Sequence, residues 1–106
     1  MVEHITNTIE NNDVVVFMKG TKKQPQCGFS QYVAVLMKTY GVTDFKDVNV
    51  LADATLRDQI KEFSNWPTIP QVYIKGQFVG GCDIMREMHE DGSLRELLTQ
   101  EKIIEA

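Results

Sequence analysis

Cys27 is the residue of this chain best suited to covalent or metal chemistry. The run Cys27-Gly28-Phe29-Ser30 has the spacing of a redox Cys-x-x-Cys motif, but a serine stands where the second thiol would be. An internal disulfide across the motif cannot form, so any thiol–disulfide chemistry needs a thiol from another molecule. A metal site here would likewise receive one protein ligand instead of two. The alternative is that a lone cysteine is only a small buried apolar residue.

The position of Cys27 favours the reactive interpretation. The residue follows a polar loop, Gly20–Gln26, and precedes a segment whose apolar side chains recur at helical spacing. The free backbone N–H groups and the dipole at the beginning of a helix stabilise a thiolate. We therefore expect Cys27 to act as a nucleophile or as a metal ligand.

Two other segments could bind a ligand. Trp66-Pro67-Thr68-Ile69-Pro70 precedes a strand, where a cis peptide bond at Pro70 would expose backbone groups to a bound peptide; an ordinary proline-rich connection is the alternative. Gly80-Gly81-Cys82-Asp83 precedes a helix, where glycines admit a ligand and the helix N-terminus favours a carboxylate. Asp83 could equally be only an N-cap, and Cys82 only a buried filler.

Two cations complete the candidate binding residues. Lys19 ends the first predicted strand and Arg57 lies on the polar side of a predicted helix, where each could be only a solvated charge. Glutathione has two carboxylates, one ammonium and one thiol. A site that combined Lys19, Arg57, the Gly81–Asp83 helix start, the Asp83 carboxylate and Cys27 would match these groups one by one.

The first half of the chain predicts the elements that position Cys27. Val2, Ile5 and Ile9 recur at helical spacing, and the Val-rich run Val14–Met18 is typical of a buried central strand. The helix after Cys27 is predicted to end at Gly41. Its apolar face consists of Phe29, Tyr32, Val33, Leu36, Met37 and Tyr40.

The second half predicts a mixed sheet. The apolar residues of a weaker strand, and then of a helix that begins near Asp53, are Phe45, Val48 and Val50, followed by Leu56, Ile60 and Phe63. Gln71–Lys75 and Phe78–Gly80 flank Gly76 as a hairpin, which adds antiparallel strands to the parallel pair. Two short helices follow, and Ser93 with Glu96 predicts a capping box at the start of the last one.

Composition narrows the class of protein. The 106 residues, 1–106, are one domain's worth, and 42% apolar with 25% charged residues is the balance of an ordinary globular domain. The net charge of −4 would repel phosphate backbones and anionic lipids, so we expect neither nucleic acid nor a membrane as a partner. The two cysteines do not resemble a secreted disulfide framework, and no secretory signal is visible. We therefore expect a reducing compartment.

The motifs together resemble those of the monothiol glutaredoxins of the Cys-Gly-Phe-Ser class. They are, in chain order, Met18-Lys19-Gly20-Thr21, Gln24-Pro25-Gln26-Cys27-Gly28-Phe29-Ser30, Asn49-Val50-Leu51, Trp66-Pro67-Thr68-Ile69-Pro70-Gln71 and Gly80-Gly81-Cys82-Asp83-Ile84. The resemblance spans nearly the whole chain. It implies a thioredoxin-like (glutaredoxin) α/β fold, with a central four-stranded mixed sheet flanked by helices. One departure is Lys22, where many relatives have proline, and it leaves the rigidity of this loop open.

The resemblance also implies a role for each candidate residue. Lys19 and Arg57 would hold the glycine carboxylate of glutathione. Ile69, before a cis proline, would pair with the cysteinyl backbone of glutathione, while Cys82 and Asp83 would bind its γ-glutamyl end. The family binds a [2Fe-2S] cluster between two protomers, with ligands from two cysteines like Cys27 and from two glutathione thiols.

Three functions follow from the resemblance. A carrier would receive the cluster from a scaffold and pass it, as a cluster-bridged homodimer, to apo iron–sulfur proteins. A glutathione-dependent thiol-disulfide oxidoreductase would use Cys27 for deglutathionylation, and a regulatory module would share a cluster with a BolA-like partner. Ser30 argues against a general dithiol reductase, so the carrier is preferred, and whether the chain is also an enzyme stays open. The expected location is the bacterial cytoplasm, or the mitochondrial matrix for a mature eukaryotic chain.

Overall fold

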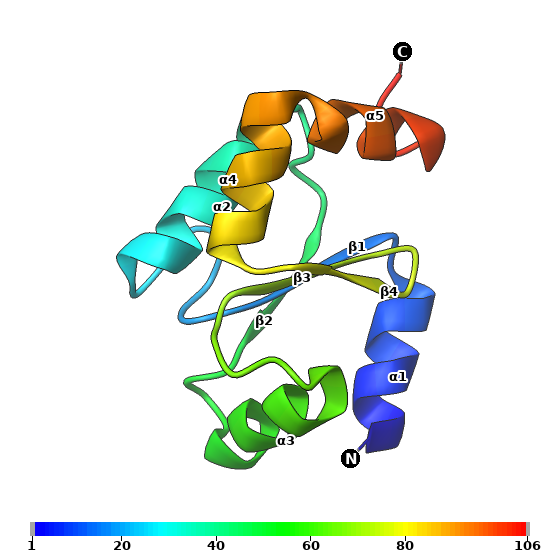
Figure 1. Ribbon diagram of the computed structural model, residues 1–106. Coiled ribbons are helices and arrows are strands. Elements are labelled where there is room, and N and C mark those ends of the chain that lie inside the picture. The colour runs from blue at the N-terminus through cyan, green and yellow to red at the C-terminus, as the bar shows by residue number, and fades with distance from the viewer. Residues whose placement is uncertain (1, 106) are drawn as a thin grey trace.

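The computed structural model describes residues 2–105 and arranges them as a four-stranded sheet with helices on both faces (Figure 1). The elements in chain order are α1 (Val2–Asn11), β1 (Val14–Met18), α2 (Gly28–Thr39), β2 (Lys46–Asn49), α3 (Ala54–Ser64), β3 (Gln71–Ile74), β4 (Gln77–Gly80), α4 (Cys82–Asp91) and α5 (Ser93–Gln100). No helix in the described part of the chain is long and apolar enough to span a membrane.

The sheet is mixed, as the sequence predicts. Its strand order is β2-β1-β3-β4, in which β1 pairs parallel with β2 and antiparallel with β3. Val16 marks the centre of this arrangement, with Asp47 opposite it on one side and Val72 on the other. All five residues of β1 are buried, because the strand has a neighbour on each side and helices above and below.

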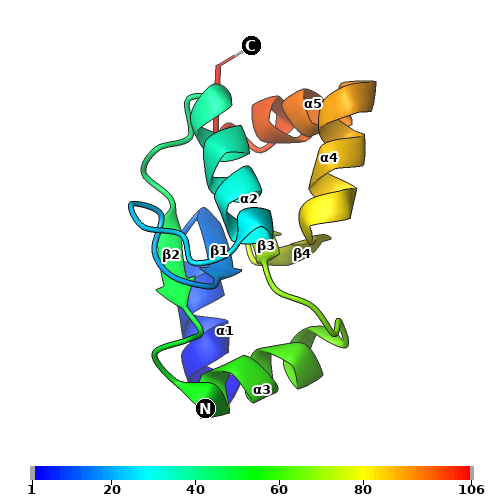
Figure 2. The same ribbon diagram turned by 90° about the vertical axis from the view of Figure 1, so that its left-hand side faces the viewer.

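Alternate side chains of β1 enter two separate apolar clusters. Val14, Val16 and Met18 pack on the face that α2, α4 and α5 cover, whereas Val15 and Phe17 pack on the face of α1 and α3. Figure 2 shows these two helical layers on opposite sides of the sheet. Lys19, the residue after the end of β1, therefore lies between the two helical layers.

The predicted helix boundaries are largely observed. Asp53 caps α3, since its carboxylate accepts hydrogen bonds from the N–H groups of Thr55 (3.0 Å) and Leu56 (3.2 Å). Gly41, with φ of 79°, follows α2 in the left-handed conformation that commonly ends a helix. The hairpin β3–β4 turns through Lys75 and Gly76.

Three local predictions are wrong. The helical spacing predicts that Phe29 and Phe63 are buried on the apolar faces of their helices, but they are 61% and 36% exposed, since Phe29 lies in the first turn of α2 and Phe63 in the last turn of α3. The capping box at Ser93 does not form. Gly92, with φ of 88°, is the N-cap of α5, so Ser93 is already helical, and its N–H donates to the Asp91 carboxylate at 2.8 Å.

Candidate functional site

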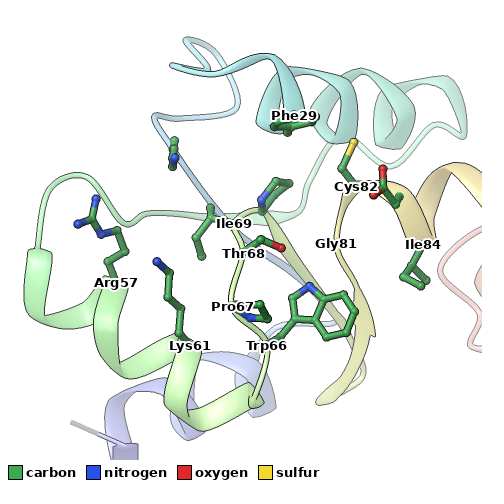
Figure 3. Close-up of a pocket in the computed structure, with 13 residues that line it drawn as sticks. Phe29, Arg57, Lys61, Trp66, Pro67, Thr68, Ile69, Gly81, Cys82 and Ile84 are labelled. Carbon is green, nitrogen blue, oxygen red and sulfur yellow. The ribbon is translucent and has the colours of Figure 1, made fainter.

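A pocket of about 340 Å³ opens where four segments distant in sequence converge (Figure 3). These segments are the end of β1 with the start of α2, the polar face of α3, the loop before β3, and the start of α4. The lining residues are Lys19, Phe29, Arg57, Lys61, Trp66, Pro67, Thr68, Ile69, Pro70, Gly81, Cys82, Asp83 and Ile84. The fold thus gathers in one pocket five of the six predicted site residues: Lys19, Arg57, Ile69, Cys82 and Asp83.

Cys27 lies beside this pocket as the N-cap of α2. Its φ and ψ of −150° and 156° are extended, and its sulfur accepts a hydrogen bond from the N–H of Ser30 at 3.3 Å. Burial alone raises the pKa of the Cys27 thiol, but hydrogen bonds from Ser30 and from the Phe29 backbone outweigh it. The charge of Lys19 adds to this effect, so the pKa lies below its ordinary value. This geometry favours Cys27 as a nucleophile or metal ligand over Cys27 as a small buried apolar residue.

Ser30 organises the thiol in a way that the motif alone does not reveal. Its side chain is fully buried, and its hydroxyl oxygen lies 3.4 Å from the Cys27 sulfur. The same oxygen accepts a hydrogen bond from the backbone N–H of Lys19 at 3.0 Å. With its acceptor position occupied by Lys19, the hydroxyl can direct its proton toward a Cys27 thiolate.

The cationic wall of the pocket contains one residue more than the sequence predicts. Lys61 lines the pocket with Arg57, and Figure 3 shows both side chains extending upward from α3 on the same side of the pocket. The two residues are four apart and so share a helical face, a spacing that could have identified Lys61 from the sequence. The buried Nε of Arg57 has no hydrogen-bond partner among the described residues.

The loop before β3 presents unpaired backbone groups to the pocket. The Ile69–Pro70 peptide bond is cis, as the resemblance predicts. Among residues 2–105, no hydrogen bond engages the backbone N–H or C=O of Ile69. Both peptide groups are therefore available to an extended ligand that lies along the loop.

The start of α4 closes the opposite side of the pocket. A Cβ on Gly81 would lie 3.1 Å from the Pro70 carbonyl oxygen and 3.3 Å from the indole nitrogen of Trp66, so a larger residue would have to push these groups apart by a few tenths of an ångström. Gly81 is also the N-cap, which makes the N-cap interpretation of Asp83 wrong, because Asp83 lies within the first turn. Cys82 is 8% exposed but lines the pocket, so it is more than a filler of the core.

The two cysteines differ in their electrostatic surroundings. Burial raises the pKa of the Cys82 thiol, and the Arg86 guanidinium, 3.9 Å from its sulfur, only partly offsets this. The negative charges of Asp83 and Cys27 raise it further. Cys82 is therefore the weaker nucleophile of the two at neutral pH.

Lys22 ties the loop before Cys27 to the segment that leads into β2. Its backbone N–H donates to the Asp47 carboxylate at 2.9 Å, and its ammonium donates to the carbonyls of Phe45 (2.7 Å) and Thr43 (3.3 Å). The ammonium also lies 4.9 Å from the centre of the Phe45 ring. A proline at this position would have neither donor, so this chain holds the loop by contacts of its own.

The potential metal ligands of this site are few within one chain. In the part of the chain that the structure describes, no group of three or more His, Cys, Asp or Glu side chains is placed to hold a metal ion. Of the two sulfurs at the pocket, that of Cys27 is the candidate ligand, because its pKa is lowered whereas the pKa of Cys82 is raised.

Proteins of known family are similar to this chain in sequence. The family profile named "Glutaredoxin" matches residues 14–79. "Probable monothiol glutaredoxin 2" of Rickettsia conorii is 55% identical over 94 residues, which cover 89% of this chain and 87% of that protein. "Glutaredoxin-related protein 5, mitochondrial" of Danio rerio is 50% identical over 96 residues, which cover 91% of this chain and 62% of that protein.

Solved structures share the fold. The solution structure of reduced poplar apo GrxS14 has a TM-score of 0.84 at 43% identity, covering 97% of this chain and 94% of the other. A crystal structure of a buckwheat glutaredoxin–glutathione complex has a TM-score of 0.84 at 25% identity, covering 97% and 91%. The chain therefore has the glutaredoxin form of the thioredoxin-like fold. This is seen in the order of its strands, in the pocket, and in the cysteine that caps α2 beside that pocket. Because the second thiol is absent and the identities are high, the chain belongs to the monothiol glutaredoxins.

Proposed function

We propose that this chain binds glutathione in the pocket and, together with the glutathione thiol, carries a [2Fe-2S] cluster to apo-proteins. The observation on which this rests is the lowered pKa of the Cys27 thiol beside a pocket rich in glutathione-compatible groups. The absence of a second thiol leaves Cys27 dependent on an outside sulfur, and bound glutathione would supply it.

The charges of the pocket support glutathione as the ligand. Lys19 and Arg57 can bind the glycine carboxylate, with Lys61 close enough on the same wall to contribute. The free peptide groups of Ile69 can pair with the cysteinyl residue as one strand pairs with another.

The other end of glutathione fits the start of α4. The backbone N–H groups at Cys82 and Asp83 can receive the γ-glutamyl carboxylate, and the Asp83 side chain can bind its ammonium. Bound in this direction, glutathione places its thiol in the middle of the pocket, on the side of Cys27. The buckwheat glutaredoxin of the same fold, solved as a complex with glutathione, supports this ligand.

The cluster would be cargo shared between two chains. A [2Fe-2S] cluster takes four ligands, and iron in such clusters is held by thiolates. One chain offers a single suitable sulfur, so two Cys27 thiolates and two glutathione thiols complete the set in a cluster-bridged homodimer. A scaffold would donate this cluster and apo iron–sulfur proteins would receive it, and a BolA-like protein could replace one protomer. A bacterial relative and a mitochondrial one support a location in the bacterial cytoplasm or the mitochondrial matrix.

The lowered pKa of Cys27 also favours a second candidate, glutathione-dependent deglutathionylation. The Cys27 thiolate would attack the glutathione sulfur of a protein mixed disulfide, releasing the protein thiolate and forming a Cys27–glutathione disulfide. A second glutathione thiolate would then attack that disulfide, releasing glutathione disulfide and restoring the Cys27 thiolate. This cycle needs only one protein thiol, and glutathione is both the reductant and the resolving thiol.

Anaerobic reconstitution distinguishes the two candidates. The chain is purified with iron, sulfide and glutathione, and the product is examined by visible absorbance, iron and sulfide analysis, and size-exclusion chromatography. A coloured dimer that converts an apo-ferredoxin to its holo form supports the carrier. A colourless monomer with rapid turnover of a glutathionylated peptide would reverse the order of the two functions.

A further inference from the structure

Gln71 is a fully buried polar residue in the wall behind the pocket. It begins β3, directly after the loop that carries Ile69, and its side chain has no exposed surface. A buried amide must have its hydrogen bonds satisfied, because an unpaired donor or acceptor in the interior is costly. The partners of this amide therefore show which part of the protein it holds.

The Gln71 amide bonds directly to the pocket loop. Its nitrogen donates to the carbonyl oxygens of Trp66 at 3.0 Å and of Thr68 at 3.2 Å. Its oxygen accepts from the Tyr73 hydroxyl at 3.4 Å. Carbonyls only accept, so the amide nitrogen must face the loop and the amide oxygen must face Tyr73.

Tyr73 fixes the other end of the amide. Its ring lies 5.6 Å from that of Phe17 and 5.4 Å from that of Phe78, within the aromatic part of the core. Burial raises the pKa of Tyr73 to about 12, so its hydroxyl remains protonated at neutral pH. The Gln71 side chain is thus held between a rigid core residue and the loop.

These bonds determine which peptide groups of the loop remain free. The carbonyls of Trp66 and Thr68 are turned inward to the amide, and the peptide groups of Ile69 are left without partners among the described residues. Trp66, Thr68 and Ile69 all line the pocket. Without the amide, the two inward carbonyls would need other donors, and the loop would have to turn to find them.

We propose that Gln71 is a positioning residue for the ligand: it holds the Trp66–Pro70 loop in the form that presents Ile69 to glutathione. This inference rests on the proposed binding of glutathione in the pocket. Gln71 itself does not line the pocket, and it acts through the loop. When the loop is held in advance, the ligand does not have to order it on binding.

Gln71→Met tests the inference, since methionine has a similar shape and no donors. We expect glutathione affinity to fall about tenfold, because only a minor fraction of the protein would keep the binding form of the loop. Val72→Ala is the matched control: it removes apolar volume from the same strand, but its side chain belongs to the opposite face of the sheet. Both variants are titrated with reduced glutathione by calorimetry, well below their melting temperatures.

The fluorescence of Trp66, the only tryptophan of the chain, provides an independent readout. In the absence of glutathione, acrylamide should quench Trp66 more strongly in Gln71→Met than in wild type or Val72→Ala. Gln71→Glu adds a variant that remains informative if Gln71→Met does not fold. Its buried carboxyl group can donate one hydrogen bond only when protonated, so its affinity relative to wild type should recover as the pH falls.

The outcomes separate this inference from the proposed function. If wild type binds no glutathione, the proposed function fails. If wild type binds and Gln71→Met loses no more affinity than Val72→Ala, glutathione binding stands and the positioning role of Gln71 is wrong. A Gln71→Glu variant with wild-type affinity at every pH would overturn the positioning role equally.

Discussion

Cys27→Ser tests the cluster proposal most directly. The change replaces a thiolate by a hydroxyl that stays protonated near neutral pH and does not bind iron in place of the thiolate. Cys27 would supply two of the four sulfurs of a shared cluster, one from each protomer, and these would be the only ligands from the protein. We expect the cluster to be lost, with the iron content falling from about one atom per chain to background.

The fold should survive this change. The Cys27 side chain caps α2 by accepting a hydrogen bond from the N–H of Ser30, and serine is among the preferred residues for that task. The free energy of unfolding of the apo-protein should change by less than about 1 kcal/mol. Unaltered far-UV dichroism and a similar urea midpoint would confirm that only the ligand has been removed.

Size-exclusion chromatography with iron analysis measures both consequences after anaerobic reconstitution. Wild type should elute as a coloured dimer and Cys27→Ser as a colourless monomer, because the cluster is what joins the protomers. Cys82→Ser is the matched control, since it makes the same atomic change at the other cysteine, and it should keep the dimer and the colour. A Cys27→Ser protein that still elutes as an iron-bearing dimer would show that the cluster is held elsewhere and would refute the reasoning.

Three further predictions concern the surroundings of Cys27. Lys19→Ala and Arg57→Ala should each weaken glutathione binding by about 1–3 kcal/mol in calorimetric titration, because each removes a charged contact to a carboxylate; unchanged affinity in both would contradict the assignment. Ser30→Ala removes a hydrogen bond that lowers the pKa of Cys27, so the pH profile of its alkylation by iodoacetamide should shift to higher pH. Lys22→Met should destabilise the chain to urea by about 1 kcal/mol, whereas a change near zero would mean that its ammonium does not hold the loop.

The elements that surround the site follow from short-range patterns in the sequence. The uninterrupted apolar run of β1 predicts a strand covered on both faces, and the structure buries all five of its residues. Asp53 predicts the beginning of α3, because a cap depends only on the next three residues. The same argument fails at Ser93, where the left-handed Gly92 takes the cap position and moves Ser93 into the helix.

The hydrogen bonds of polar side chains could not be predicted from such patterns. The Gln71 amide bonds to carbonyls only three and five residues before it, but no periodicity indicates these bonds, because they depend on the path that the loop takes between Trp66 and β3. Lys22 likewise looks like a departure from its relatives, and only the fold shows that Asp47 and the carbonyl of Phe45 receive its donors. The hydrogen-bond partners of polar side chains are set by the tertiary structure, whereas the apolar spacing that predicts helices and strands can be read within a short stretch of sequence.

Ser30, which stands in place of the second thiol of the motif, has a structural role of its own. A cysteine at this position would offer Cys27 an internal disulfide partner and a route to dithiol chemistry. The serine removes that route and keeps a buried hydroxyl that bonds to Lys19 and faces the Cys27 sulfur. The result is a thiol with a lowered pKa that has no protein thiol to pair with inside its own motif. In the function proposed above, this thiolate shares its chemistry with an outside sulfur, which glutathione bound in the neighbouring pocket would supply.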